Sequence, residues 1–263
     1  MEINETKNVI CIKWGTYYGA KYINSLYRGI KKNTKYNINF YCFTDNSDGF
    51  DDGIIAKPLP TMNVKEIRNA YLKEVGLCDN NLGGLTGQRV LYFDLDTVVV
   101  DNIDSFFELP KNDEFYIIND WNTRGNRVGQ GSCFSFVVGT LGYIKDYFEE
   151  HYMEIYDKYY TASQEYLSDK VVEKYGKLNF WPASWAKSFR FHCLPTPLIP
   201  FLRRFKTATI PNKAKIICFH GYPKLEDAIE GVWPEKKAWK RLFYKHLRPV
   251  AWLKNYWGGG SSF

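Results

Sequence analysis

Short apolar runs alternate with segments of helical spacing along the first part of the chain, and this alternation constrains the fold most. VICIKW (residues 9–14) has strand length, GAKYINSLYRGIKKN (19–33) repeats apolar residues at helical intervals, and INFYCFTD (38–45) is strand-like again. A strand, a helix and a second strand in this order predict a βαβ unit with parallel strands. We therefore predict an α/β domain around a mostly parallel central sheet.

The alternation continues to about residue 176, after which loops rich in Trp, Pro and basic residues follow. The further predicted elements are a weaker helix over 64–75, strands at 89–94, 115–120 and 133–138, helices over about 141–160 and 163–175, and a strand at 215–220. Of the 263 residues 45% are hydrophobic and 17% aromatic, so the chain can bury a substantial core.

Two aspartates, Asp94 and Asp96, interrupt the apolar segment RVLYFDLDTVVVDN (89–102). Carboxylates are rarely buried unless they are paired or bound to a cation, so the segment predicts a strand end that opens onto a charged ligand. Residues two apart in a strand point to the same face, and both carboxylates can then reach one ion. Mg²⁺ or Mn²⁺ bridging to a diphosphate suits these oxygen ligands.

A second polar group follows the apolar strand in ICFHGYPK (217–224). His220 comes directly after the strand, Gly221 allows close backbone approach, and Lys224 can offer a charge to a phosphate. An imidazole that completes a site of two carboxylates favours Mn²⁺ over Mg²⁺. The segment is therefore a candidate partner of the two aspartates.

Positive charge is concentrated in the last third of the chain. Residues 174–263 hold 17 of the 35 lysines and arginines but only 4 of the 29 acidic residues. KKAWKRLFYKHLRPVAWLKNYW (236–257) lies in a predicted basic, aromatic amphipathic helix over 234–257 that Pro249 interrupts. Such a segment suits an anionic membrane surface, or it packs its aromatic residues on the domain. No recognised nucleic-acid-binding module accompanies the charge, and we expect no nucleic-acid partner.

Cysteine usage and the N-terminus indicate the compartment. The six cysteines lie far apart with no CxxC pair, and several sit in apolar runs, so we expect reduced core residues. MEINETKNVI has neither a basic start nor an apolar segment, and no stretch approaches the length of a membrane span. We expect a cytoplasmic protein, peripheral at the inner face of the membrane if the basic segment binds lipid.

Taken together, these segments resemble the GT-A glycosyltransferases, particularly the family 8 type that includes glycogenin and bacterial lipopolysaccharide glycosyltransferases. The resemblance runs from about Val9 to Trp239. It rests on YCFTD, LYFDLDTVVVDNIDSFFEL, GSCFSFVVG, SQEYL and CFHGYPK in this order. It implies a GT-A domain over residues 1–225, and the composition of the remainder predicts a basic helical segment over 226–257 and a flexible tail over 258–263.

The resemblance implies a metal site and catalytic roles. Asp94, Asp96 and His220 would hold Mn²⁺, or Mg²⁺, against the diphosphate of a nucleotide sugar. Lys224 would bind the diphosphate and stabilise the charge on the departing nucleotide, and Gln164 would lie beside the reacting sugar.

The remaining implied roles are in substrate binding. Thr44 and Asp45 would face the base, Arg68 would stand near the sugar or phosphate, and Gly221 would adjoin the donor. The acceptor would meet Gln130 and Ser132 at the start of the segment GSCFSFVVG. The residue types of WPASWAKSFR (181–190) add Trp185, Lys187 and Arg190 as candidate acceptor residues. Aromatic faces stack on sugars and cations bind acceptor phosphates, although the same loop is equally well interpreted as part of the core.

The sequence also departs from the family pattern. Ser163 stands where the family usually has Asp, and Gln130 stands where Asn is usual. The interval from His220 to Lys224 is shorter than the common interval. The identity of the donor sugar therefore does not carry over from the resemblance.

The predicted function is metal-dependent transfer of a hexose or related sugar from a nucleotide-diphosphate donor, with UDP expected, to a glycan or glycolipid acceptor. Lipopolysaccharide or capsule synthesis and retention of anomeric configuration are what the resemblance implies. FDLDTVV also fits the first motif of Mg²⁺-dependent phosphatases of the haloacid-dehalogenase type. A non-catalytic sugar- or membrane-binding module is the third alternative, for which Ser163 is the hint.

Overall fold

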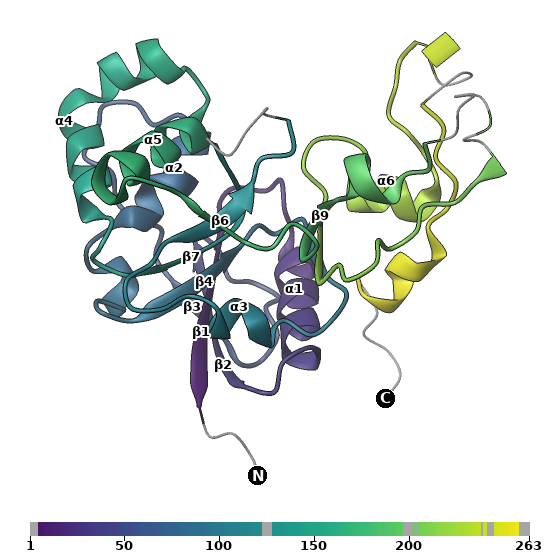
Figure 1. Cartoon of the computed structure of the whole chain (residues 1–263), viewed down its shortest axis with the longest axis horizontal. Coiled ribbons are helices and arrows are strands. Elements are labelled where there is room, and N and C mark those ends of the chain that lie inside the picture. The colour runs from purple at the N-terminus through teal and green to yellow at the C-terminus, as the bar shows by residue number, and fades with distance from the viewer. Residues whose placement is uncertain are drawn as a thin grey trace. The chain divides into compact units, whose positions relative to one another are not determined.

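A computed structural model describes residues 5–122, 128–196, 202, 205–237, 239–240 and 245–257. The chain divides into two compact units, each built from several stretches of sequence (Figure 1). The first unit comprises Met1–Ala20, Lys35–Leu95 and Asp104–Trp181. The second comprises Lys21–Thr34, Asp96–Ile103 and Pro182–Phe263. The boundary between Leu95 and Asp96 falls inside the segment that carries both predicted metal-binding aspartates.

A mixed sheet forms the centre of the first unit. Its strands are β1 (Thr6–Lys13), β2 (Asn37–Thr44), β3 (Ile54–Lys57), β4 (Arg89–Phe93), β6 (Tyr116–Asn119), β7 (Gly129–Val137) and β8 (Asn179–Phe180). They lie in the order β3-β2-β1-β4-β7-β6-β8. The neighbours from β3 to β4 are parallel, as are β6 and β8, whereas β7 is antiparallel to both β4 and β6. The predicted α/β class with a mostly parallel sheet is confirmed.

The helices of the first unit are α2 (Asn69–Glu74), α3 (Asp104–Glu108), α4 (Gly142–Tyr159) and α5 (Ser163–Tyr175). α2, α4 and α5 gather on one side of this unit in Figure 1, where α5 contacts α2, α4 and β7. The ring of Tyr71 packs against those of Phe148 and Tyr156, with centroids 5.0 Å apart in both pairs. This buried aromatic cluster joins α2, which frames the candidate site, to α4.

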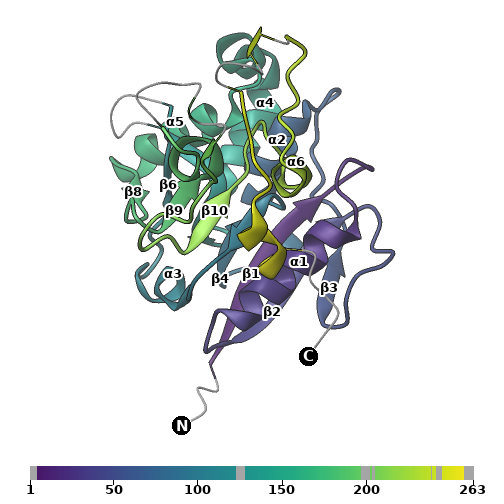
Figure 2. The same ribbon diagram turned by 90° about the vertical axis from the view of Figure 1, so that its right-hand side faces the viewer.

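The second unit has its own small sheet, of β5 (Thr97–Val99), β9 (Ala186–Ser188) and β10 (Ile216–Cys218). β10 is antiparallel to β5 and parallel to β9, which lies beside it in Figure 2. The other elements are α1 (Ala20–Lys32), α6 (Leu225–Glu230), a π-helical turn (Phe189–Cys193) and a 3₁₀ turn (Ala251–Asn255). Phe219 and Leu253 are among the buried residues of its core.

The C-terminal segment differs from its prediction. Among the described residues of 234–257, only 239–240 and the 3₁₀ turn Ala251–Asn255 are helical, and 245–250 are not. Val250, Leu253 and Trp257 are buried in the same core as Val98 and Phe219. The segment therefore belongs to the second unit, which crosses the boundary predicted at residue 225. The predicted flexible tail over 258–263 lies outside the described residues.

Two simpler expectations concern cysteines and membrane spans. All six cysteines are buried and free of disulfides, as predicted. Burial, and then a hydrogen bond with Cys42 on the adjacent strand, raise the pKa of Cys11. Within the described residues, none of the helices has the length and apolar character needed to cross a bilayer.

Candidate active site

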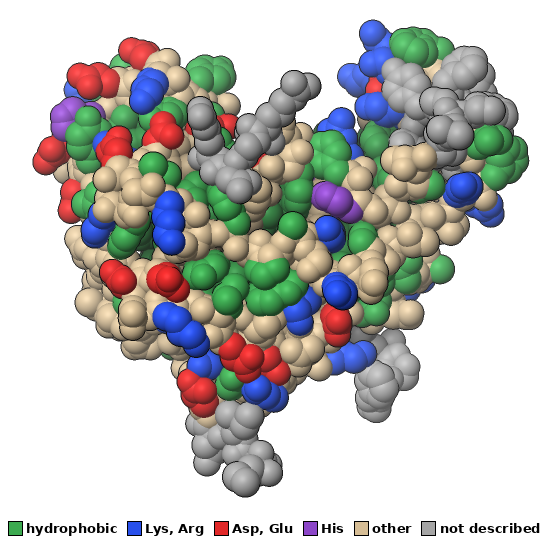
Figure 3. Space-filling view, viewed as in Figure 1, with side chains coloured by type: hydrophobic (Ala, Val, Ile, Leu, Met, Phe, Trp, Pro, Cys, Tyr) green, Lys and Arg blue, Asp and Glu red, His purple; other side chains and the backbone are tan. Residues whose placement is uncertain are grey.

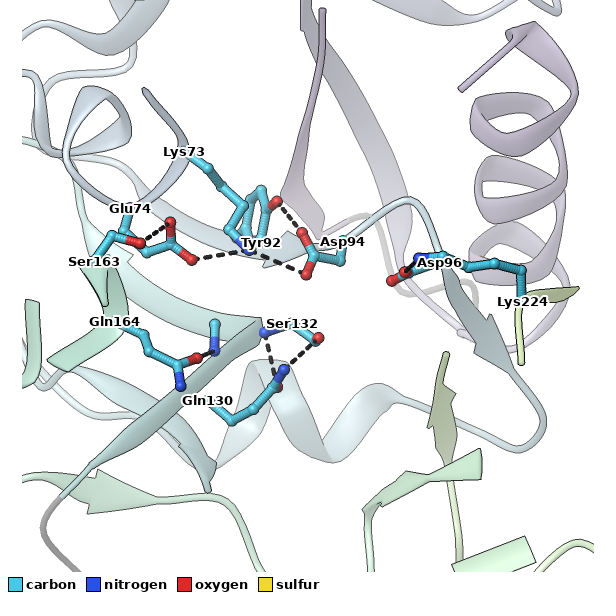
Figure 4. Close-up of polar contacts among 11 residues, drawn as sticks. Lys73, Glu74, Tyr92, Asp94, Asp96, Gln130, Ser132, Ser163, Gln164 and Lys224 are labelled. Carbon is cyan, nitrogen blue, oxygen red and sulfur yellow. Dashed lines mark hydrogen bonds and ion pairs between the residues drawn. The ribbon is translucent and has the colours of Figure 1, made fainter. Parts of the chain in front are cut away.

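Asp94 follows β4 and is held by two side chains of the first unit (Figure 4). The Lys73 ammonium donates to its Oδ2 over 3.2 Å, and the Tyr92 hydroxyl donates to its Oδ1 over 2.6 Å. The Asp94 backbone N–H donates to the carbonyl oxygen of Ser132 over 2.9 Å, which ties the carboxyl end of β4 to β7. The carboxylate is thus fixed in place and lies beside a cation.

Lys73 and Glu74, which sequence analysis did not single out, form a buried ion pair on α2. Their charged atoms lie 2.8 Å apart, and only 4% of the Glu74 side chain is exposed. Burial raises the pKa of Glu74 above its ordinary value. Burial alone would lower the pKa of Lys73, but the carboxylates of Asp94 and Glu74 outweigh it and raise that pKa. The only sequence signal was two adjacent charges inside the apolar stretch AYLKEVGL (70–77).

Ser163 and Gln164 begin α5 and face this pair. The Ser163 hydroxyl donates to Oε2 of Glu74 over 3.0 Å. The backbone N–H of Gly131 on β7 donates to Oε1 of Gln164 over 3.4 Å. The start of α5 is therefore joined to α2 through Ser163 and to β7 through Gln164, as Figure 4 shows.

Gln130 and Ser132 bind each other along β7. The Gln130 side-chain amide donates to the Ser132 hydroxyl over 2.8 Å and accepts from the Ser132 backbone N–H over 2.9 Å. Both residues are buried. Their predicted role toward an acceptor stays a prediction, and the contacts that the structure gives them are with each other.

Thr44 and Asp45 lie at the carboxyl end of β2, where the sequence placed them. The Gly15 backbone N–H donates to Oδ2 of Asp45 over 2.8 Å, and Lys13 Nζ lies 3.7 Å from its Oδ1. That backbone hydrogen bond, and then the Lys13 charge, hold the pKa of Asp45 below its usual 3.8. The loops after β1 and β2 are thereby joined by an ionised carboxylate.

Arg68 precedes α2 and binds the end of α4. Its guanidinium donates to the carbonyl oxygens of Tyr156 and Tyr160 at 3.5 and 3.0 Å. It also stacks on the Tyr156 ring, 4.1 Å from the centroid. Because a helix C-terminus carries partial negative charge, these contacts account for the arginine structurally. Its predicted role near a donor stays a prediction.

Asp96 begins the second unit and meets the segment after β10. The Phe219 backbone N–H donates to the Asp96 carbonyl oxygen over 2.9 Å, which continues the β5–β10 ladder by one residue. Lys224 Nζ lies 3.4 Å from Oδ2 of Asp96, whose side chain is 9% exposed. The Lys224 backbone N–H donates to Oδ2 of Asp227 over 2.8 Å at the start of α6. The pairing of β5 with β10 thus brings together Asp96 and Lys224, two predicted site residues that are distant in sequence.

His220 and Gly221 follow β10 in the same unit. Nε2 of His220 lies 2.7 Å from the Ser188 hydroxyl oxygen at the end of β9. Gly221 has a φ of 74°, a backbone conformation that glycine adopts without strain. Ser188 was not predicted, because the three-residue strand β9 has no distinctive sequence pattern.

The predicted acceptor residues of 181–190 divide by burial. Trp185 and Lys187 are half-buried, and Arg190 is exposed with its guanidinium 5.4 Å from the Phe191 ring centroid. Trp181 in the same motif is a core residue, because its indole packs on Phe106 and its Nε1 donates to the Cys133 carbonyl oxygen. The core interpretation therefore holds for the start of this loop.

The three predicted metal ligands are distributed over both units. Asp94 belongs to the first, and Asp96 and His220 belong to the second. Across the described part of the chain, no three His, Cys, Asp or Glu side chains gather closely enough to hold a metal ion. Two carboxylates and an imidazole fit Mn²⁺ or Mg²⁺ in chemistry, and each carboxylate is neutralised here by a lysine ammonium. The metal assignment stays a prediction.

Comparison with known proteins identifies the fold. No family model and no curated protein sequence matches the chain. Two solved structures of the galactosyltransferase LgtC, one with donor and acceptor sugar analogs and one of an active-site mutant, match with TM-scores of 0.53 and 12% identity. Both cover 83% of this chain, and the matches span 88% and 89% of the LgtC chains. The chain therefore has the GT-A fold of these galactosyltransferase structures.

Proposed function

We propose that the protein is a metal-dependent glycosyltransferase that uses a nucleotide-diphosphate sugar. The observation that carries the proposal is the contact of Asp96 with Lys224 and Phe219, beside His220 in sequence. It places an acidic residue, a cation and the imidazole-bearing segment at one end of the β5–β10 pair. The shared fold supports the same conclusion, since LgtC is a galactosyltransferase.

In the proposed site, the metal ligands, the diphosphate-binding residue and the residue beside the sugar are different side chains. Asp94, Asp96 and His220 would hold Mn²⁺ or Mg²⁺, which would supply Lewis-acid stabilisation of the diphosphate. Lys224 binds the same diphosphate and offsets the charge that develops on it as the sugar departs. Gln164 borders the donor sugar. With no general base assigned, the departing phosphate accepts the acceptor's proton, and the anomeric configuration is retained.

The substrates follow from the surrounding residues. Thr44 and Asp45 face the base of a donor for which UDP is the expected nucleotide, and Arg68 and Gly221 adjoin its other parts. The acceptor is a glycan or glycolipid of lipopolysaccharide or capsule synthesis. It is bound by two groups of residues, which are Gln130 and Ser132 on β7 and Trp185, Lys187 and Arg190 around β9.

A membrane-surface location extends the proposal. Trp239 is 54% exposed, and Lys236 and Lys237 beside it are also exposed. In the view of Figure 3 the second unit displays more basic than acidic side chains. An exposed indole flanked by cations suits an anionic bilayer interface, so we place the protein peripherally at the cytoplasmic face of a membrane.

The two alternatives are not favoured. A phosphatase of the haloacid-dehalogenase type and a non-catalytic binding module each explain one motif, but neither explains the fold shared with a glycosyltransferase. The three functions differ in what they release. A transferase frees nucleotide from a nucleotide sugar, a phosphatase frees phosphate from monoesters, and a binding module releases neither.

The decisive experiment is nucleotide release from a panel of UDP-, GDP-, ADP- and CMP-sugars with Mn²⁺. The expected result is slow release from one UDP-sugar that accelerates with a glycan acceptor and is lost in Asp96→Asn. Asp101→Asn, which alters an exposed carboxylate in the same segment, is the matched control. Phosphate release from monoesters without nucleotide release would instead establish the phosphatase.

A further inference from the structure

The buried ion pair of α2 contacts both the start of α5 and the predicted metal ligand Asp94. Lys73 and Glu74 are adjacent in sequence, and their charged atoms meet at 2.8 Å in a site that leaves 4% of Glu74 exposed. Glu74 also accepts a hydrogen bond from Ser163, and Lys73 donates to Asp94. Buried pairs of this kind add little stability, because desolvation offsets the attraction between the two charges. Stability alone therefore does not explain the pair, and a role in the site would explain it.

Gly131 makes room for the Glu74 carboxylate. A Cβ at this position would lie 2.6 Å from Oε1 of Glu74, closer than a Cβ carbon approaches a carboxylate oxygen. The same glycine donates its backbone N–H to Gln164, the predicted catalytic residue. The carboxylate thus lies against β7 between the start of α5 and Lys73, and a side chain at position 131 would displace it.

The chain of contacts runs from Ser163 through Glu74 and Lys73 to Asp94. The family resemblance expects a carboxylate at position 163, where this chain has a hydroxyl. Since Ser163 Oγ lies 3.0 Å from Glu74 Oε2, an aspartate there would put its charge close to where Glu74 now has its own. The negative charge is therefore present, but α2 supplies it.

We propose that Glu74 is a positioning residue, which takes over the charge missing at Ser163 and holds the Lys73 ammonium against Asp94. The inference rests on the proposed function for its effect on turnover, but not for the contact itself. Without the Glu74 charge, Lys73 loses one of its two anionic partners and no longer fixes the Asp94 carboxylate.

A charge-relocation experiment tests the inference. Glu74→Gln removes the charge with little change in shape, and turnover of the donor is expected to fall about a hundredfold, as for a catalytic group displaced by about 1 Å. Adding Ser163→Asp to that variant is expected to recover most of the lost turnover, because the new carboxylate replaces the missing charge. An aspartate also suits the first turn of α5. Ser163→Asp alone is expected to be harmful, since it sets two carboxylates side by side.

Two further variants separate positioning from folding. Gly131→Ala is expected to displace the Glu74 carboxylate and to lower the turnover number more than it raises the KM for the donor. Glu173→Gln breaks a Lys–Glu pair of the same 2.8 Å length on the exposed face of α5 and is the control, with unchanged turnover expected. Equal turnover in Glu74→Gln and the parent protein would overturn the inference.

A second readout is independent of activity. In spectra of ¹⁵N-lysine-labelled protein, the signal of the Lys73 ammonium is assigned because it disappears in Lys73→Gln. In the parent protein this ammonium is expected to be protected from hydrogen exchange with solvent. Protection is expected to vanish in Glu74→Gln and to return with Ser163→Asp. If no donor is turned over, the proposed function fails, while this pattern still supports the contact. Protection that persists in Glu74→Gln overturns the inference whether or not the protein is active.

Discussion

The Asp96 carboxylate lies 3.4 Å from the ammonium of Lys224, which follows it by 128 residues in the chain. The pairing of β5 with β10 produces this contact, because the Phe219 backbone N–H also donates to the Asp96 carbonyl oxygen. An acidic residue and a basic residue are thereby kept together at the end of a small, buried sheet. The arrangement leads to predictions about the site and about the fold that supports it.

Asp96→Asn is expected to lower Mn²⁺-dependent nucleotide release by about a thousandfold, because the substitution removes a charge that would bind the metal. The side chain keeps its shape, and Lys224 reaches solvent, so the free energy of unfolding should change by only about 1 kcal/mol. Nucleotide release and calorimetry check both parts. Full activity in this variant would remove Asp96 from the metal site.

Lys224→Gln should lower kcat/KM by about a hundredfold, because the lysine charge opposes the charge on the departing diphosphate. The loss should appear mainly in kcat and should shrink for a donor with a better leaving group. Steady-state kinetics with two donors measure this difference. Lys213→Gln, at an exposed lysine of the same unit, is the control for a general loss of positive charge.

Asp79 should make the free energy of unfolding depend on pH in the acid range. Burial raises its pKa, but the Lys145 ammonium and the backbone N–H groups of Asn81 and Leu82 outweigh burial and hold the pKa below 3.8. Because the folded pKa lies below the unfolded one, the contribution is complete well above pH 3.8 and is lost as pH falls through the folded pKa.

The corresponding measurement compares Asp79→Asn with the parent protein from pH 7 to pH 2. At pH 7 the variant should be about 1–2 kcal/mol less stable, and the two unfolding curves should converge at the acid end. Asp113→Asn, at an exposed aspartate, should show no such convergence. A stability gap that stays constant with pH would contradict the assignment.

Trp181 and Trp185, four residues apart, should respond differently to substitution. Trp181 is 3% exposed, so Trp181→Ala should lower the free energy of unfolding by about 3–5 kcal/mol through the cavity it leaves. Trp185 is half-buried, and Trp185→Ala should cost about 1 kcal/mol while raising the KM for the acceptor. Denaturant unfolding and acceptor titration distinguish these effects.

Membrane binding should depend on exposed residues of the C-terminal segment. Deleting that segment would remove Leu253 and Trp257 from the core, so point substitutions are the appropriate test. The triple variant Lys236→Glu, Lys237→Glu and Trp239→Ala should lower affinity for anionic liposomes at least about tenfold, given about 1 kcal/mol per cation. Liposome sedimentation measures the change, with neutral liposomes as the control. Unchanged binding would exclude this surface.

The longer elements could be predicted because their own sequence determines them. β1 and β2 are short apolar runs with consecutive buried residues, α1 buries one face at helical spacing, and the observed bounds lie within a few residues of the prediction. β3, β5, β8 and β9 were missed. Each has only two to four residues and exists because a partner strand pairs with it, which no local pattern reveals.

The sequence by itself determined the α/β alternation, the sheet and the two aspartates placed at a strand end, because periodicity and the cost of burying charge are local properties. Tertiary structure decided which cations the carboxylates meet. Lys73 reaches Asp94 from a helix, and Lys224 reaches Asp96 through strand pairing. It also decided that Glu74 carries the charge beside Ser163, since that depends on the packing of α2, α5 and β7 and on the space left at Gly131.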